Sequence, residues 1–157
     1  MTEDLMTRLE LMSLQDSYVA ALDAARLEDW PTFFTDDCLY EIIPAENEEF
    51  DLPAPLVRCT NTAMLRDRVI SLRHANIYEQ PAYRHMVSGM IWSQDGDEIE
   101  MTSSYVVINT SIEGESEIYQ AGCYKDRVVR TPEGLRFKQK RCVYDTLRVH
   151  TLLAYPI

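Results

Sequence analysis

The sequence predicts an α+β fold in which N-terminal helices pack on one face of a long, curved antiparallel sheet. Apolar residues recur at helical spacing in the first half of the chain, whereas from Arg84 onward they alternate with a period of two. Tight-turn sequences also divide the second half, and short turns between long strands make antiparallel neighbours. With 157 residues, 46% of them hydrophobic, the chain is expected to form a single domain over residues 1–157.

The first predicted element is an amphipathic helix over residues 3–26. Its apolar positions are Leu5, Leu9, Met12, Val19 and Leu22, spaced by 4, 3, 7 and 3 residues. That spacing places them on one helical face, so we expect this face to contact the sheet. Glu3 and Asp4 lie at the N-terminal end, where the helix dipole favours negative charge.

A second, short helix is predicted at Trp30 and Pro31, because proline fits the first turn of a helix. The first strand should follow from Cys38 to Ile43. Residues 44–60 are acidic and contain three prolines, so we expect an excursion away from the core, whose role stays open. A third helix is predicted over about residues 62–75, where apolar residues return to helical spacing.

Four long strands are predicted in the second half of the chain, over residues 84–93, 98–110, 115–130 and 135–150. Tight turns separate them at Asp95-Gly96, Glu113-Gly114 and Thr131–Gly134. The strands exceed the usual length of about 5–6 residues, so we expect strong twist and bulges, with Gly89 and Gly122 as bulge candidates. A bent sheet wrapped around a long helix makes a cone with a central cavity. This plan resembles the nuclear transport factor 2-like (cystatin-like) fold.

Charge and composition argue against several partners. The net charge is −11, from 26 acidic against 15 basic residues, whereas nucleic acids and anionic membranes bind cationic surfaces. No apolar run approaches about 18 residues, and the acidic N-terminus lacks the features of a signal peptide, so neither a transmembrane helix nor a leader is expected. The four cysteines lie far apart without a CxxC motif, which favours free thiols in the reducing cytoplasm.

The sequence carries no complete metal, nucleotide or nucleophile motif. A Rieske cluster needs Cys-x-His and Cys-x-x-His pairs, but no cysteine here is followed by histidine at either distance. The three histidines, His74, His85 and His150, lie too far apart for the spacing of iron or zinc motifs. We therefore expect no metal, no cofactor and no catalytic residue on this chain.

One alternative function is a stand-alone isomerase or dehydratase, which would use acid–base groups in the cone cavity. Its candidate residues are Tyr18, Asp37, Tyr40, His85 and Tyr105. The same residue types also occur as buried aromatics, or as a hydrogen-bonded histidine in a sheet, without any catalytic role. A third function is a non-enzymatic ligand-binding or scaffold protein with the same cone.

Residues 64–85 form a basic segment in an otherwise acidic protein. Arginine is favoured in desolvated contacts beside aromatic residues, so the segment is a candidate subunit contact, although a solvated rim with local carboxylate partners is the simpler alternative. The apolar tail Leu152–Ile157 should also be docked, and we favour a neighbouring subunit as its partner. The candidate interface residues are Arg66, Arg68, Arg73, Tyr78, Tyr83, Arg84, His85, Tyr155 and Ile157.

Two segments resemble a known family in their order and spacing. They are residues 21–42, ALDAARLEDWPTFFTDDCLYEI, and residues 64–89, MLRDRVISLRHANIYEQPAYRHMVSG. On these segments the chain resembles the small (β) subunit of bacterial Rieske-type aromatic-ring-hydroxylating dioxygenases, and the resemblance extends over about residues 10–157. The acidic segment 44–60 matches this family poorly.

The resemblance implies a non-catalytic subunit that supports a metal-bearing α subunit in an α3β3 hexamer. It further implies that the Rieske [2Fe–2S] cluster, the mononuclear Fe(II) and the substrate pocket belong to the α subunit, which receives electrons from a ferredoxin or reductase. Within the family, the chain is most similar to small subunits that serve aromatic acids of the benzoate, anthranilate, salicylate or terephthalate type.

Overall fold

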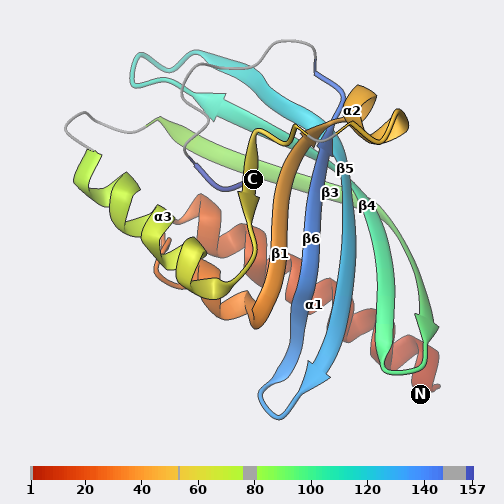
Figure 1. Cartoon of the computed structure of the whole chain (residues 1–157). Helices are drawn as coiled ribbons and strands as arrows, with labels where there is room; N and C mark the ends of the chain where they lie inside the picture. The colour runs from red at the N-terminus through yellow and green to blue at the C-terminus, as the bar shows by residue number, and fades with distance from the viewer. Residues whose placement is uncertain (1, 53, 76–80, 147–154) are drawn as a thin grey trace.

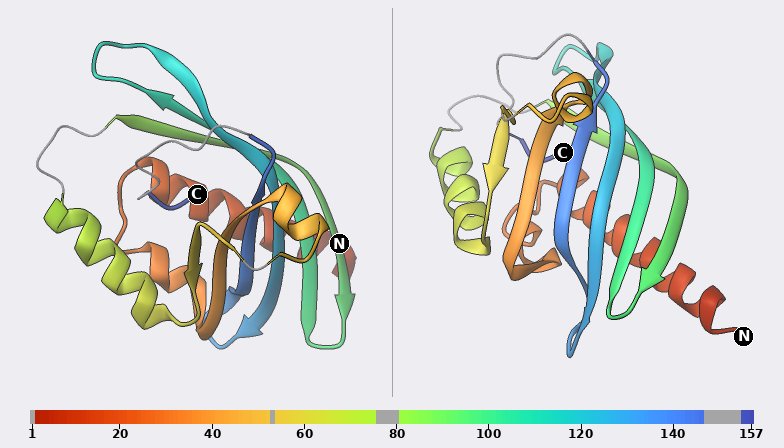
Figure 2. Two further views of the ribbon diagram at one scale, coloured as in Figure 1. Left: turned by 45° about the horizontal axis from the view of Figure 1, so that its top comes forward. Right: turned by 45° about the vertical axis from the view of Figure 1, so that its right-hand side comes forward.

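The computed structural model describes residues 2–52, 54–75, 81–146 and 155–157 (Figure 1). The helices are α1 (Glu3–Asp23), the 3-10 helix η1 (Trp30–Phe33), α2 (Ala45–Glu49) and α3 (Thr62–Ala75). The strands are β1 (Phe34–Pro44), β2 (Val57–Cys59), β3 (Ala82–Asp95), β4 (Glu98–Thr110), β5 (Ser116–Thr131) and β6 (Gly134–Tyr144). Figure 2 shows α1 running along the inner side of the curved sheet, so the predicted α+β arrangement is confirmed.

The six strands form one sheet in the order β2-β1-β6-β5-β4-β3. Strands β3 to β6 make the predicted antiparallel meander. The expectation of an antiparallel sheet is wrong at one place, because β1 pairs with β6 in parallel, with Leu39 opposite Gln139 and Pro44 opposite Tyr144. The two strands are separated by the whole meander, so no turn sequence indicates their relative direction.

The strand and helix boundaries differ from the prediction mainly in the first half of the chain. β1 begins at Phe34, directly after η1, rather than at Cys38. The acidic segment 44–60 contains α2 and the short strand β2, which pairs antiparallel with β1 at the sheet edge. β6 ends at Tyr144, and residues 147–150 of the predicted last strand lie outside the described residues.

Only one of the two predicted glycine bulges is present. The β3–β4 register shifts between Ser88 and Ile91, and Gly89 there has a φ of +67°, so that bulge is confirmed. Gly122 instead pairs in register with Tyr105. A Cβ atom on Gly122 would lie 2.1 Å from the main-chain oxygen of Val143, so this position needs glycine because two strands approach closely.

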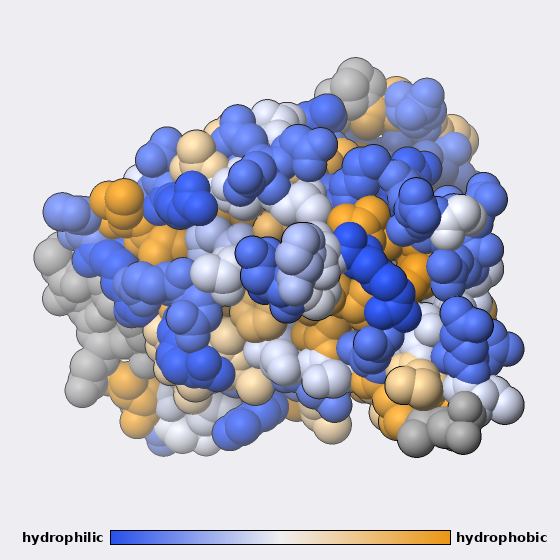
Figure 3. All heavy atoms as spheres, turned by 90° about the horizontal axis from the view of Figure 1, so that it is seen from below, coloured by the Kyte–Doolittle hydropathy of each residue, from blue (hydrophilic) through white to orange (hydrophobic). Residues whose placement is uncertain are grey.

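The predicted core-facing side of helix α1 is confirmed only at its C-terminal end, where Leu22 is buried and Val19 packs against the core. Leu5, Leu9 and Met12 are 43–48% exposed, and the prediction that they contact the sheet is wrong. The buried side chains of α1 are those of Thr7, Leu11, Leu14, Gln15, Tyr18, Ala21 and Leu22. The helix thus carries two apolar stripes, and tertiary packing selects between them. Figure 3 shows apolar patches on a mostly polar surface.

Candidate functional site

The interior of the cone is occupied by residues from the end of the chain. The Tyr18 hydroxyl donates to the main-chain oxygen of Ile157 at 2.7 Å, and the indole N–H of Trp30 donates to the Tyr18 oxygen at 3.2 Å. The main-chain N–H of Ile157 donates to the Tyr40 hydroxyl oxygen at 3.0 Å. Burial raises the pKa of Tyr18 and of Tyr40 well above the usual value, so both phenols stay protonated and act as hydrogen-bond partners.

Two further contacts anchor the tail within its own chain. The Tyr155 ring stacks on Tyr83 with centroids 4.4 Å apart, and the Tyr155 hydroxyl donates to the main-chain oxygen of Leu22. Tyr155 and Ile157 are 5% and 1% exposed. The expectation that the tail docks on a neighbouring subunit is therefore wrong for residues 155–157, which complete the core of this chain.

A buried ion pair lies deeper in the cone. Lys140 Nζ is 2.9 Å from Asp126 Oδ2, and both side chains are inaccessible to solvent. The ammonium group also lies over the rings of Tyr124 and Phe137, at 3.8 and 4.2 Å from their centroids. Burial, partly offset by Lys140, raises the pKa of Asp126 to about 6. Neither Lys140 nor Asp126 was among the predicted site residues, although both interrupt the alternating pattern at inward-facing strand positions.

His85 pairs with the carboxylate of Asp23, which was not among the predicted site residues. His85 Nδ1 lies 2.6 Å from Asp23 Oδ1, and the His85 main-chain N–H donates to both Asp23 oxygens at 3.0–3.1 Å. The His85 side chain is buried, and within the described part of the chain its Nε2 has no hydrogen-bond partner. Asp37 is exposed, so the structure does not bring it to His85.

The tyrosines of the alternative acid–base site form hydrogen bonds and ring contacts with other residues of the chain. Tyr105 donates to Gln120 Oε1 at 2.6 Å and stacks on Tyr124 at 4.3 Å between centroids. Tyr18 and Tyr40 both form hydrogen bonds with the main chain of Ile157. Within the described residues, the predicted set therefore divides into separate structural contacts, and two of its tyrosines bind the main chain of Ile157.

The basic segment is only partly exposed. Arg73 binds Glu28 through Nε and Nη2 at 2.8 Å each and donates to the main-chain oxygen of Ala25 at 2.7 Å. This contact lowers the pKa of Glu28 to about 2. Arg66 and Arg84 are exposed and Arg68 is half-buried, whereas Tyr78 lies outside the described residues.

Within the described residues, no three His, Cys, Asp or Glu side chains come together as a metal site would require. The four cysteines are free thiols, three of them buried. Burial raises the pKa of Cys142 to about 12, so this thiol stays protonated. Nor does any helix in the described ranges have the length and apolar character needed to cross a membrane.

A curved sheet wrapped around a helix, with tyrosines inside the cone, is the arrangement of one class of protein, the SnoaL-like domains. A family model for the SnoaL-like domain matches residues 3–141. A solved structure of a scytalone dehydratase homologue from Novosphingobium aromaticivorans DSM 12444 has a TM-score of 0.74 at 18% identity, covering 98% of this chain and 95% of the other, which is a likeness of fold alone. These matches confirm the predicted cone.

Three relatives identify the family within this class. The chain is 58% identical to the anthranilate 1,2-dioxygenase small subunit of Burkholderia cepacia, over 100% of this chain and 98% of the relative. It is 32% identical to subunit beta 2 of the terephthalate 1,2-dioxygenase terminal oxygenase component of Comamonas sp, over 98% and 100%. A crystal structure assigned as the beta subunit of an aromatic-ring-hydroxylating dioxygenase from Novosphingobium aromaticivorans DSM 12444 has a TM-score of 0.91 and 40% identity, over 99% and 100%. The chain belongs to the small (β) subunits of aromatic-ring-hydroxylating dioxygenases.

Proposed function

We propose that this chain is the non-catalytic, supporting subunit of an oxygenase that hydroxylates an aromatic acid. The observation that carries the non-catalytic role is the filled cone, in which Tyr18 and Tyr40 bind the main chain of Ile157 instead of a substrate. The aromatic-acid class is supported by the relatives, whose names specify anthranilate and terephthalate. Anthranilate is the first substrate to test, because that relative is 58% identical.

The partner in this proposal is a catalytic α subunit, as membership of a small-subunit family implies. We propose an α3β3 hexamer in which the α subunit holds the Rieske [2Fe–2S] cluster and the mononuclear Fe(II), with a ferredoxin or reductase as electron donor. A single domain over residues 1–157 and a cytoplasmic location are parts of the same proposal. The free thiols of all four cysteines support that location.

The proposed α-subunit contact includes the exposed arginines Arg66 and Arg84 and the half-buried Arg68. A planar guanidinium binds carboxylates and main-chain oxygens well when water is excluded, so removing such a contact costs about 2–5 kcal/mol of association. Tyr83, Tyr155 and Ile157 would support this surface from inside the chain, since their described contacts are internal. Arg73 would support the same surface indirectly, through its ion pair with Glu28.

Co-expression with a catalytic α subunit of this family tests the proposal. We expect one complex on gel filtration, anthranilate-dependent oxygen consumption by that complex, and no turnover by this chain alone. Arg84→Ala should weaken the complex more than it lowers the melting temperature of the isolated chain. Turnover of anthranilate by this chain alone, or an α subunit that is fully assembled and active without it, would contradict the proposed role.

A further inference from the structure

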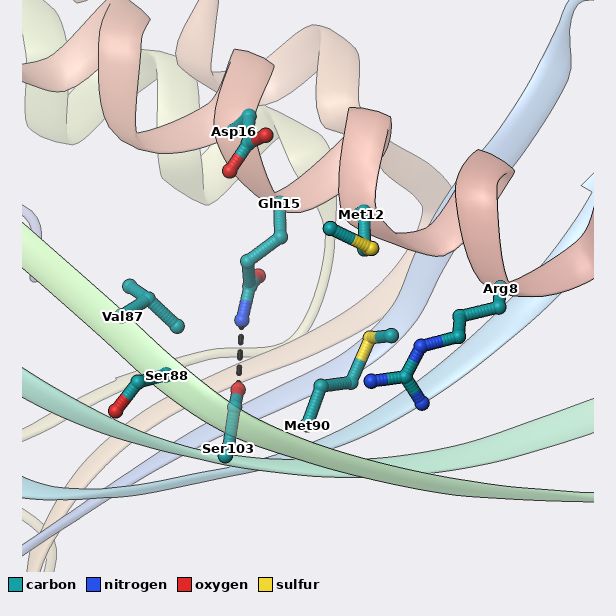
Figure 4. A pocket seen from close by; sticks show the side chains of 9 residues that line it. Arg8, Met12, Gln15, Asp16, Val87, Ser88, Met90 and Ser103 are labelled. Carbon is teal, nitrogen blue, oxygen red and sulfur yellow. Dashed lines mark hydrogen bonds between the residues drawn. The ribbon is translucent and has the colours of Figure 1, made fainter. Parts of the chain in front are cut away.

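A pocket of about 160 Å³ opens between α1 and β3 (Figure 4). Its apolar walls include Met12 of α1 and Val87 and Met90 of β3. The bulge at Gly89 makes this possible, because it interrupts the β3–β4 pairing and allows Val87 and Met90, three residues apart, both to pack toward the core. A cavity of roughly this volume holds one benzene ring, and thioethers make favourable contacts with aromatic rings.

The polar lining of the pocket combines the carboxylate of Asp16 with side chains that can donate hydrogen bonds. Gln15 Nε2 donates to Ser103 Oγ at 2.7 Å, and Gln15 Oε1 accepts from Lys140 Nζ at 3.3 Å. Lys140 therefore fixes the orientation of the Gln15 amide, and Ser103 is left with its own hydroxyl proton to donate. Gln15 and Ser103 are 5% and 2% exposed, so this polar pair is built into the wall of the pocket.

Arg8 adds a positive charge at the same place. Figure 4 shows its guanidinium extending from α1 toward Met90, while Asp16 lies on the other side of Gln15. Arg8 makes no ion pair or hydrogen bond with any residue in the described ranges, and it is exposed. An unpaired guanidinium beside an apolar wall favours a planar carboxylate, which it can bind through two parallel hydrogen bonds.

We propose that the pocket between α1 and β3 binds a small aromatic carboxylate. The ring contacts Met12, Val87 and Met90, the carboxylate binds the Arg8 guanidinium, and the Ser103 hydroxyl donates to an acceptor on the ligand. The inference stands on these residues and does not require the proposed oxygenase role. It places a ligand site on the small subunit, between α1 and β3.

Titration calorimetry of the full chain with benzoate and with anthranilate tests the site. We expect saturable binding that weakens about tenfold or more in Arg8→Gln, a change of at least about 1.4 kcal/mol in binding free energy. Met12→Trp should also abolish binding, because an indole at this half-exposed position fills the pocket without changing its charge. Arg66→Gln is the matched control, since it removes an exposed arginine elsewhere and should leave the affinity unchanged.

Benzamide distinguishes a carboxylate site from a merely apolar one, and it should bind much more weakly than benzoate. Equal binding of the two, equal losses in Arg8→Gln and Arg66→Gln, or no binding at millimolar benzoate would each overturn the inference. Chemical-shift changes at Val87 and Met90 on adding benzoate locate the ligand independently of affinity. Failure of these tests with an intact, active α-subunit complex would leave the proposed function standing.

Discussion

Lys140 and Asp126 are charged residues in the middle of an aromatic core. Taking both charges out of water costs several kcal/mol per ion, and their mutual attraction and the surrounding rings offset that cost only while both partners are present. Asp126 Oδ1 lacks a hydrogen-bond partner among the described residues, so the pair is incompletely satisfied. It therefore fixes the arrangement of Tyr124, Phe137 and Gln15 more than it stabilises the fold.

Removing one partner of this pair should be far more damaging than breaking a surface pair. Lys140→Met leaves Asp126 buried without a counter-charge, and we expect a loss of about 3–5 kcal/mol in the free energy of unfolding, measured with urea. Lys138→Met is the control, because Lys138 binds Glu98 at the surface and should cost about 0–1 kcal/mol. Equal losses in the two variants would mean that the buried pair has no special role.

The raised pKa of Asp126 gives the pair a pH signature. The folded carboxyl has a pKa of about 6 against an ordinary value of 3.8, so between these values the folded state binds more protons than the unfolded state. The stabilisation that comes from the raised Asp126 pKa is a contribution to the free energy of unfolding. It is fully present below pH 3.8 and is lost as the pH rises through 6. Asp126→Asn removes this term, so the slope of unfolding free energy against pH over that window should become more positive than in the unmodified chain. Parallel curves would contradict the assignment.

At the scale of single elements, hydrophobic periodicity predicted which helices and strands form, but not which face of each one contacts the core. The period-two pattern and turn sequences predicted β4 with its observed limits and β3 and β5 to within two residues at each end, and α3 follows its helical spacing. The buried face of α1 could not be predicted, because Leu5, Leu9 and Met12 form one apolar stripe while Leu11, Leu14 and Tyr18 form another. Asp23 was missed for a related reason: only the packing of the α1 end against β3 brings it to His85.

Gly122 is the glycine on which the β5–β6 pairing depends. Gly122→Ala would place a methyl group against the backbone of Val143, which cannot move as a flexible side chain can, and we expect a loss of about 3 kcal/mol or failure to fold. Gly114→Ala is the matched control, because it has open space around it and only its φ of +89° resists a side chain, at about 1 kcal/mol. Melting temperatures that fall equally would show that space at Gly122 is not limiting.

For the whole molecule, the central feature is a cone closed by its own tail. The parallel β1–β6 pair and the bonds from Tyr18 and Tyr40 to Ile157 all join residues at least about 100 positions apart. Local sequence patterns carry no information about contacts of this range, which is why the cone was predicted and its filling was not. The resemblance to the family, in contrast, could be recognised from the sequence, because it depends on the order of local segments.

Deleting residues 155–157 should open the cone. The loss of a buried isoleucine and of the partners of Tyr18 and Tyr40 should lower the free energy of unfolding by about 3–5 kcal/mol and increase binding of a hydrophobic dye. Tyr18→Phe is the control, because it removes only the hydroxyl and should cost about 1–3 kcal/mol without opening the interior. A shortened chain as stable as the unmodified one would show that the tail is not part of the core.

The tail also sets the order of events during synthesis. Tyr18 emerges from the ribosome 139 residues ahead of Ile157, so its hydroxyl lacks this hydrogen-bond partner until residue 157 has been translated. Contacts of such long range form late and slowly, because the intervening chain must first be ordered. The bonds of Tyr18 and Tyr40 to Ile157 therefore belong to the last contacts that form as the cone folds, and until they form both buried phenols lack these partners.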